Sequence, residues 1–136
     1  MIGLDTNIVI RYIAQDDALQ SPKATALMEN LSSENPGYLP LIALVEIVWV
    51  LSGRYGASKA DIIKVLETLL RTKDLYIEQS ETVWNALRLF AAASADFADC
   101  LIERSCHQAK CDYTATFDAK AAKFAGMKLL TKNDPA

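Results

Sequence analysis

The apolar residues of this chain fall into two kinds of segment that alternate along its length. Short apolar runs are typical of buried strands, and they predict strands at residues 2–4, 38–39, 75–78, 113–117 and 128–130. Between these runs, apolar residues recur every three or four positions, which is the spacing of a helix with one buried face. The alternation predicts an α/β fold: a three-layer α/β/α sandwich with a central, mostly parallel sheet.

Start signals mark several of the predicted helices. Ser58 and Asp61 have the spacing of a capping box ahead of an apolar helical stretch. Ser21 is followed by a proline, which predicts a cap with proline at the first helical position. Asp118 ends a predicted strand and would cap a short helix over residues 119–125.

Length and composition favour one globular domain over residues 1–136. The chain is 51% hydrophobic and 23% charged, and it contains no repeat, low-complexity tract or linker. Its longest apolar run is shorter than the roughly 18 residues that span a bilayer, and no signal peptide precedes the first strand. We therefore expect a cytoplasmic protein.

The segment Leu41 to Leu51 is apolar at every position except Glu46. Read as a helix it is apolar all round, so we expect it to be largely buried. A buried, unpaired carboxylate costs several kcal/mol unless it is protonated, ion-paired or bound to a metal. The sequence thus indicates a functional Glu46; an exposed edge position or an ion pair with an arginine is the structural alternative.

Three aspartates occupy comparable places. Asp5 follows the first predicted strand, Asp118 follows the fourth, and Asp99 lies early in an apolar helix, three residues after Asp96. Each alone reads as a helix cap. Together with Glu46 they predict a cluster, because ligands of parallel α/β folds bind outside the carboxyl ends of the strands. Mutual repulsion and burial should raise the pKa of at least one of them.

The chemistry of this set points to a hard divalent cation. Oxygen ligands without histidine or cysteine favour Mg²⁺ or Mn²⁺ over Zn²⁺. A metal-bound water, aligned with a P–O bond, suits phosphodiester hydrolysis. Hydrogen bonds from Thr6, Asn7 and Thr116 would aim the carboxylates.

Charge and cysteine content narrow the classes of ligand that the protein could bind. The net charge is −3, but setting the four acids apart changes the formal charge of the remainder to +1, so a nucleic acid is not excluded. Structural zinc usually needs four cysteine or histidine ligands, and Cys100, Cys106, Cys111 and His107 contain no Cys-x-x-Cys pair. We interpret the cysteines as small buried residues in a reducing compartment.

The ordered motifs resemble those of a known family over essentially the whole chain. They are IGLDTN at residues 2–7, Glu46 on its apolar helix, DFAD at residues 96–99 and TFD at residues 116–118. This set is similar to that of PIN-domain ribonucleases, and in particular to the VapC-type toxins of type II toxin–antitoxin modules.

The resemblance implies the site. Asp5 and Asp99 would be the primary Mg²⁺ (or Mn²⁺) ligands, Glu46 and Asp118 would complete the acidic site, and Asp96 would be a cap with a water-mediated role. It further implies an endoribonuclease with an RNA substrate, a cognate antitoxin protein as partner, and a homodimer.

Other classes remain open at this stage. Haloacid-dehalogenase-like phosphatases also carry an Asp after the first strand, but their second acid would fall on Asn7. A phospho-acceptor receiver domain would want paired acids there and a late lysine. Both would form an aspartyl-phosphate, whereas the nuclease would not. A pure RNA-binding module is disfavoured by the acidic pI near 5.1.

Overall fold

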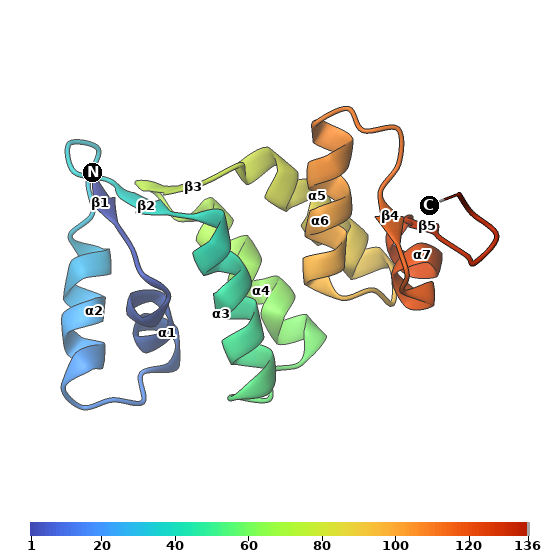
Figure 1. Cartoon of the computed structure of the whole chain (residues 1–136). Helices are drawn as coiled ribbons and strands as arrows, with labels where there is room; N and C mark the ends of the chain where they lie inside the picture. Colours follow the sequence, from blue (N-terminus) through green and yellow to red (C-terminus); the bar gives the residue numbers. More distant parts are fainter. Residues whose placement is uncertain (136) are drawn as a thin grey trace. The chain divides into compact units, whose positions relative to one another are not determined.

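A computed structural model describes residues 1–135 of the chain. They divide into two compact units, the first spanning Met1–Ser80 and the second beginning at Glu81. Each unit combines helices with parallel strands (Figure 1). The α/β class and the parallel pairing expected from the sequence are confirmed.

The first unit contains a three-stranded parallel sheet in the order β1-β2-β3. In register, Ile2 pairs with Gly37, and Gly37 pairs with Leu75. The strands are β1 (Ile2–Gly3), β2 (Gly37–Leu39) and β3 (Leu75–Ile77). Four helices connect them: α1 (Thr6–Ala14), α2 (Gln20–Glu29), α3 (Leu41–Gly53) and α4 (Lys59–Arg71).

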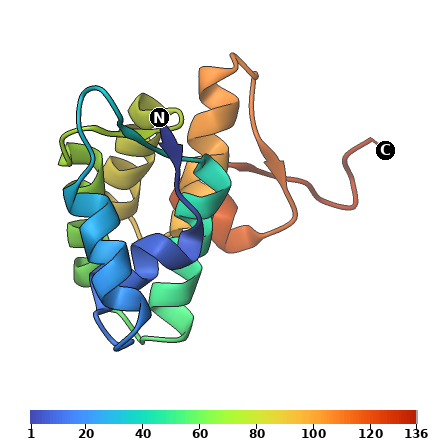
Figure 2. The same ribbon diagram turned by 90° about the vertical axis from the view of Figure 1, so that its left-hand side faces the viewer.

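Helix α1 packs against both α2 and α3, and the views agree that the three lie side by side (Figures 1 and 2). The core of this unit is formed by buried side chains from strands and helices alike: Leu4, Val9, Ile10, Leu39, Leu44, Ile47 and Leu66. Gly37 lies in the central strand, where a Cβ would meet the Leu31 side chain at 2.9 Å. This packing holds the end of β1 beside α3.

The second unit contains two helices, a parallel strand pair and a third helix between the paired strands. Phe90 and Phe97 pack edge to face with ring centroids 5.7 Å apart. Cys100 is buried as expected, whereas Cys106 is only half-buried and Cys111 is exposed, so the expected burial is wrong for those two. The elements are α5 (Ser80–Ala92), α6 (Phe97–Gln108), β4 (Ala115–Thr116), α7 (Ala119–Ala125) and β5 (Lys128–Leu129).

One helix start differs from the sequence prediction. Ser21 lies inside α2, which begins at Gln20, so Ser21 is not its cap. The Asp17 carboxylate instead accepts hydrogen bonds from the backbone N–H groups of Leu19 (3.0 Å) and Gln20 (2.7 Å). Ser21 is buried, and its hydroxyl accepts from the Asp17 backbone N–H. The N-cap residue itself is Leu19, whose side chain makes no capping bond, and Asp17 satisfies the first backbone N–H groups in its place.

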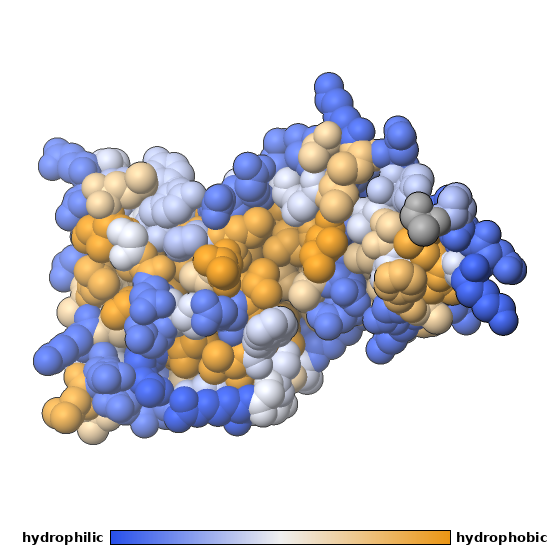
Figure 3. Space-filling view, in the orientation of Figure 1, coloured by the Kyte–Doolittle hydropathy of each residue, from blue (hydrophilic) through white to orange (hydrophobic). Residues whose placement is uncertain are grey.

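The burial of α3 also differs from the prediction. Its inner face, which includes Leu44 and Ile47, is buried. Ile42 and Trp49 are 72% and 64% exposed, however, and Glu46 between them is exposed as well. Apolar surface is visible in the region of α3 in Figure 3. An apolar sequence does not force burial when the fold leaves one face of the helix uncovered.

Candidate functional site

Asp5 stands at the junction between β1 and α1. Its backbone is extended, and its carboxylate accepts a hydrogen bond from the Thr6 backbone N–H at 2.7 Å, so it is the N-cap of α1. The carboxylate is exposed, whereas Thr6 is buried. Within residues 1–135 the Thr6 hydroxyl has no hydrogen-bond partner. A buried hydroxyl of this kind usually finds water or a ligand oxygen.

Asp5 and Glu46 line one pocket. Helix α3 projects Glu46 from its middle, and the end of β1 brings Asp5 to the same place. The pocket has a volume of about 340 Å³ and is formed entirely within the first unit. Its lining is Asp5, Thr6, Asn7, Ile10, Arg11, Glu46, Val50 and Arg54. Two acidic residues and Thr6 therefore line a space large enough for a hydrated cation.

The second unit groups the other acids around the start of α6. Asp96 is the N-cap of this helix and accepts a hydrogen bond from the Ala98 backbone N–H at 3.0 Å. Asp99 follows in the first turn and is half-buried. Its pKa is raised by partial burial first, and then by the negative charges of Asp96 and Asp118, against a smaller opposing effect of Lys120. A cation beside Asp99 would relieve this repulsion.

Asp118 follows β4 and caps α7. Its carboxylate accepts hydrogen bonds from the backbone N–H groups of Lys120 (2.8 Å) and Ala121 (3.4 Å). The Thr116 hydroxyl accepts from the Asp118 backbone N–H at 3.0 Å. Asp118 is thus held by its own turn, as Asp5 is.

The chain therefore presents its acids as two sets. Asp5 and Glu46 share a pocket of the first unit, and Asp99 and Asp118 are electrostatically coupled in the second. Among residues 1–135, no three His, Cys, Asp or Glu side chains meet as a ready-made metal cluster. The donors of both sets are oxygen atoms, which fit Mg²⁺ or Mn²⁺ and not a soft metal.

Two arginines in the first pocket were not singled out from the sequence. Arg11 follows Asn7 by four residues on α1, and Arg54 follows Val50 by four residues at the end of α3. Residues four apart lie on the same helix face. Helical periodicity could therefore have placed both arginines beside the acids.

The geometry agrees with what comparison with known proteins finds. The PIN domain family matches residues 2–127, and the chain belongs to this family. It is 24% identical to a VapC ribonuclease of Aquifex aeolicus (strain VF5) over 99 residues, which cover 72% of this chain and 73% of that protein. The PIN fold and the resemblance to VapC-type PIN-domain proteins, both expected from the sequence, are thereby confirmed.

No membrane-spanning helix is found in the described part of the chain, where every helix falls short in length or apolarity.

Proposed function

We propose that this protein is a Mg²⁺- or Mn²⁺-dependent endoribonuclease and the toxin of a toxin–antitoxin module. The family match and the VapC ribonuclease relative support a nuclease. The observation that carries the proposal is the pocket lined by Asp5, Glu46 and Thr6, whose buried hydroxyl has no hydrogen-bond partner among the described residues. Because the family match runs through both units, we propose that they belong to one PIN-like nuclease domain spanning residues 1–136.

In this proposal Asp5 and Asp99 are the primary metal ligands, and Glu46 and Asp118 complete the acidic site. A bound cation would lower the pKa of a coordinated water and neutralise charge on the leaving oxygen. The chain's own contribution is to orient the carboxylates. The Thr6 N–H fixes one oxygen of Asp5 and leaves the other free to bind.

Thr116, Asn7 and Asp96 support this arrangement from nearby. Thr116 fixes the turn from which Asp118 projects. Asn7 lines the Asp5 pocket, where its side-chain amide can donate to a bound water or ligand. Asp96 adds negative charge beside Asp99, which favours a cation there.

The proposed function also implies which partners the protein binds. RNA is the substrate, a cognate antitoxin protein inhibits the enzyme, and the active form is a homodimer in the cytoplasm. The VapC ribonuclease relative supports the first two of these. The phosphatase and receiver-domain alternatives are disfavoured because the chain belongs to the PIN family.

Cleavage by near-isosteric variants tests the site. Asp5→Asn and Asp99→Asn each remove one ligand charge, so we expect Mg²⁺-dependent cleavage of structured RNA to fall by about 100-fold or more. Asp112→Asn is the control, because Asp112 is exposed and outside the pocket. EDTA should abolish cleavage by the wild type, and circular dichroism should show all variants folded.

The assignment fails if either site variant retains near-wild-type cleavage while EDTA still abolishes it. Trapping of a covalent aspartyl-phosphate during turnover would instead favour the phosphatase or receiver-domain class.

A further inference from the structure

The pocket lined by Asp5 and Glu46 is also lined by two arginines, whose positive charges can bind anions. We propose that Arg11 and Arg54 form a phosphate-binding pair that positions the RNA strand over the acidic site. This inference rests on the proposed function and adds to it the residues that hold the substrate backbone. Both arginines, like the pocket, belong to the first unit.

Arg11 is held in place by its neighbours. Its Nε donates to the Gln20 side-chain oxygen at 2.8 Å, and Nη1 donates to Asp16 at 3.2 Å and to the Tyr55 hydroxyl at 3.5 Å. The side chain is only 20% exposed. Nη2 donates no hydrogen bond to any group within residues 1–135. A fixed guanidinium whose Nη2 group is free loses little entropy when it binds a phosphate oxygen.

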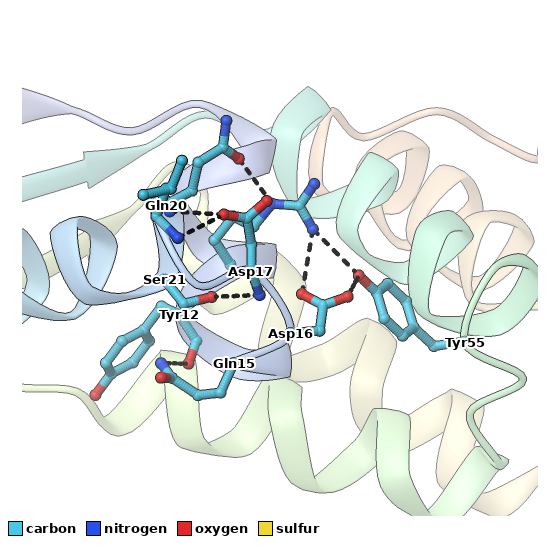
Figure 4. A network of polar contacts seen from close by, with 9 residues as sticks. Tyr12, Gln15, Asp16, Asp17, Gln20, Ser21 and Tyr55 are labelled. Atoms are coloured by element: carbon cyan, nitrogen blue, oxygen red, sulfur yellow. Dashed lines mark hydrogen bonds and ion pairs between the residues drawn. The ribbon is translucent and has the colours of Figure 1, made fainter.

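Tyr55 connects the two arginines. Its hydroxyl donates to Asp16 at 2.6 Å, and its ring lies 5.8 Å from the Arg54 guanidinium carbon (Figure 4 shows Asp16 and Tyr55 facing each other). The hydrogen bond from Tyr55 is the main cause of the lowered pKa of Asp16, and it raises the pKa of Tyr55. Asp16 is therefore ionised at neutral pH and keeps Arg11 oriented.

Arg54 has no carboxylate partner. Among the described residues none lies within ion-pair distance of its guanidinium, although Glu46 lines the same pocket. Arg11 likewise pairs with Asp16 and not with Asp5 or Glu46. The acids and the bases of the pocket are thus not neutralised by each other. A ligand that carries both a cation and a phosphate would satisfy both sets.

The pocket continues beyond Arg11. A second pocket, of about 310 Å³ and lined also by Gln20, Lys23 and Leu27, shares Asn7 and Arg11 with the first. Arg11 therefore lies where two concavities meet. An extended strand that crosses from one to the other would pass its phosphates along Arg54, Arg11 and Lys23 in turn.

RNA binding without cleavage tests the pair. A fluorescent single-stranded RNA is titrated with the protein in EDTA over a range of KCl concentrations. Arg54→Gln should reduce affinity about tenfold at low salt and reduce the slope of log K against log salt by about 0.7, the loss of one phosphate contact. Lys64→Gln is the control, since Lys64 is exposed on α4 and lines neither pocket.

Chemical removal of phosphate charge gives the sharper result. Single methylphosphonate linkages are placed along the RNA, and at one of them the wild type should lose about tenfold in affinity. Arg54→Gln should lose nothing further at that linkage, because the contact is already absent. In the cleavage assay Arg54→Gln should raise KM about tenfold and leave kcat nearly unchanged.

Arg11→Lys keeps the positive charge but lacks the forked guanidinium group. It should therefore lose RNA affinity, but by less than Arg54→Gln does. Equal salt slopes for Arg54→Gln and Lys64→Gln, or a methylphosphonate effect that persists in Arg54→Gln, would overturn the pair. If the wild type binds RNA as expected but never cleaves it with Mg²⁺ or Mn²⁺, the proposed function fails and the phosphate-binding pair stands.

Discussion

Glu46 lies on the solvent-facing side of α3, between Ile42 and Trp49. An exposed carboxylate can meet a metal ion without first leaving water, so its desolvation cost is small. The same exposure means that the fold does not depend on this charge. We therefore expect Glu46 to contribute to the chemistry of the site and not to the stability of the fold.

We expect Glu46→Gln to change the free energy of unfolding in EDTA by less than about 0.5 kcal/mol, because the residue is exposed. The same change should lower Mg²⁺-dependent cleavage about tenfold or more, since it removes one acid of the site. Urea unfolding followed by circular dichroism measures the first quantity, with Glu67→Gln on α4 as a charge-matched control.

A loss of about 3 kcal/mol in Glu46→Gln would contradict this picture, because that magnitude indicates a broken buried ion pair.

Helix α4 begins with a complete capping box. The Ser58 hydroxyl accepts from the Asp61 backbone N–H at 3.1 Å, and the Asp61 carboxylate accepts from the Ser58 backbone N–H at 3.4 Å. We expect Ser58→Ala to lower the free energy of unfolding by about 1 kcal/mol, as loss of an N-cap usually does. Urea unfolding checks this value. Ser33→Ala, in an exposed loop, should leave the urea midpoint unchanged.

The start of helix α2 predicts how the stability of the protein depends on pH. Hydrogen bonds from the Gln20 and Leu19 backbone N–H groups hold the pKa of Asp17 below the usual range of a carboxyl group. A carboxyl whose pKa is lower in the folded state contributes stability above its unfolded pKa and loses it as pH falls through the folded pKa. Asp17→Ala should therefore lower the melting temperature at neutral pH, and the difference from wild type should shrink as the pH falls below the ordinary carboxyl pKa of about 3.9.

Thermal unfolding of both proteins from neutral to acid pH measures this difference. A gap in melting temperature that stays constant across the range would show that the ionised Asp17 carboxylate is not what caps α2.

The same two helices show what a sequence reveals about an element. The α4 cap could be predicted because both partners are polar and lie at the fixed spacing of the motif. The α2 start was misread because Ser21 and its proline form a common N-terminal pair, while the residue that accepts the N–H bonds, Asp17, lies four positions earlier. Local propensity is overruled when a better acceptor lies within reach of the first turn.

Burial of α3 could not be predicted for a related reason. A helix that is apolar on every side could be covered on any of its faces, and tertiary packing decides which face is buried. Here the face of Leu44 and Ile47 is covered and that of Ile42 and Trp49 is not.

For the molecule as a whole, the order of strands and helices and the PIN family could be predicted from the spacing of motifs. The approach of Asp5 to Glu46 also follows from topology, because β1 delivers Asp5 to the strand ends beside α3. The role of Arg11 in the same pocket depends on the side-chain contacts of Asp16, Gln20 and Tyr55, which come from three different segments. Such contacts have no fixed spacing, so the sequence does not reveal them.

Expression in a bacterial host tests the whole protein as a toxin. Production of the wild type without an antitoxin should arrest growth, because cleavage of cellular RNA would be unrestrained. Asp5→Asn should restore growth at equal protein level, measured by optical density and immunoblotting. Equal inhibition by both forms would mean that the growth effect does not come from the nuclease activity.

The pairing of β1 with β2 has a consequence for the time at which the protein becomes active during its own synthesis. Ile2 finds its partner in Gly37, about 35 residues further along the chain, and Glu46 follows later still. A ribosome adds roughly 5–20 residues per second, and parallel strands that are distant in sequence pair slowly. Asp5 is thus among the first residues made, yet Glu46 cannot join it in one pocket until β2 and α3 have emerged and folded back. A nascent chain, or one cut short before α3, therefore carries the aspartate without the pocket.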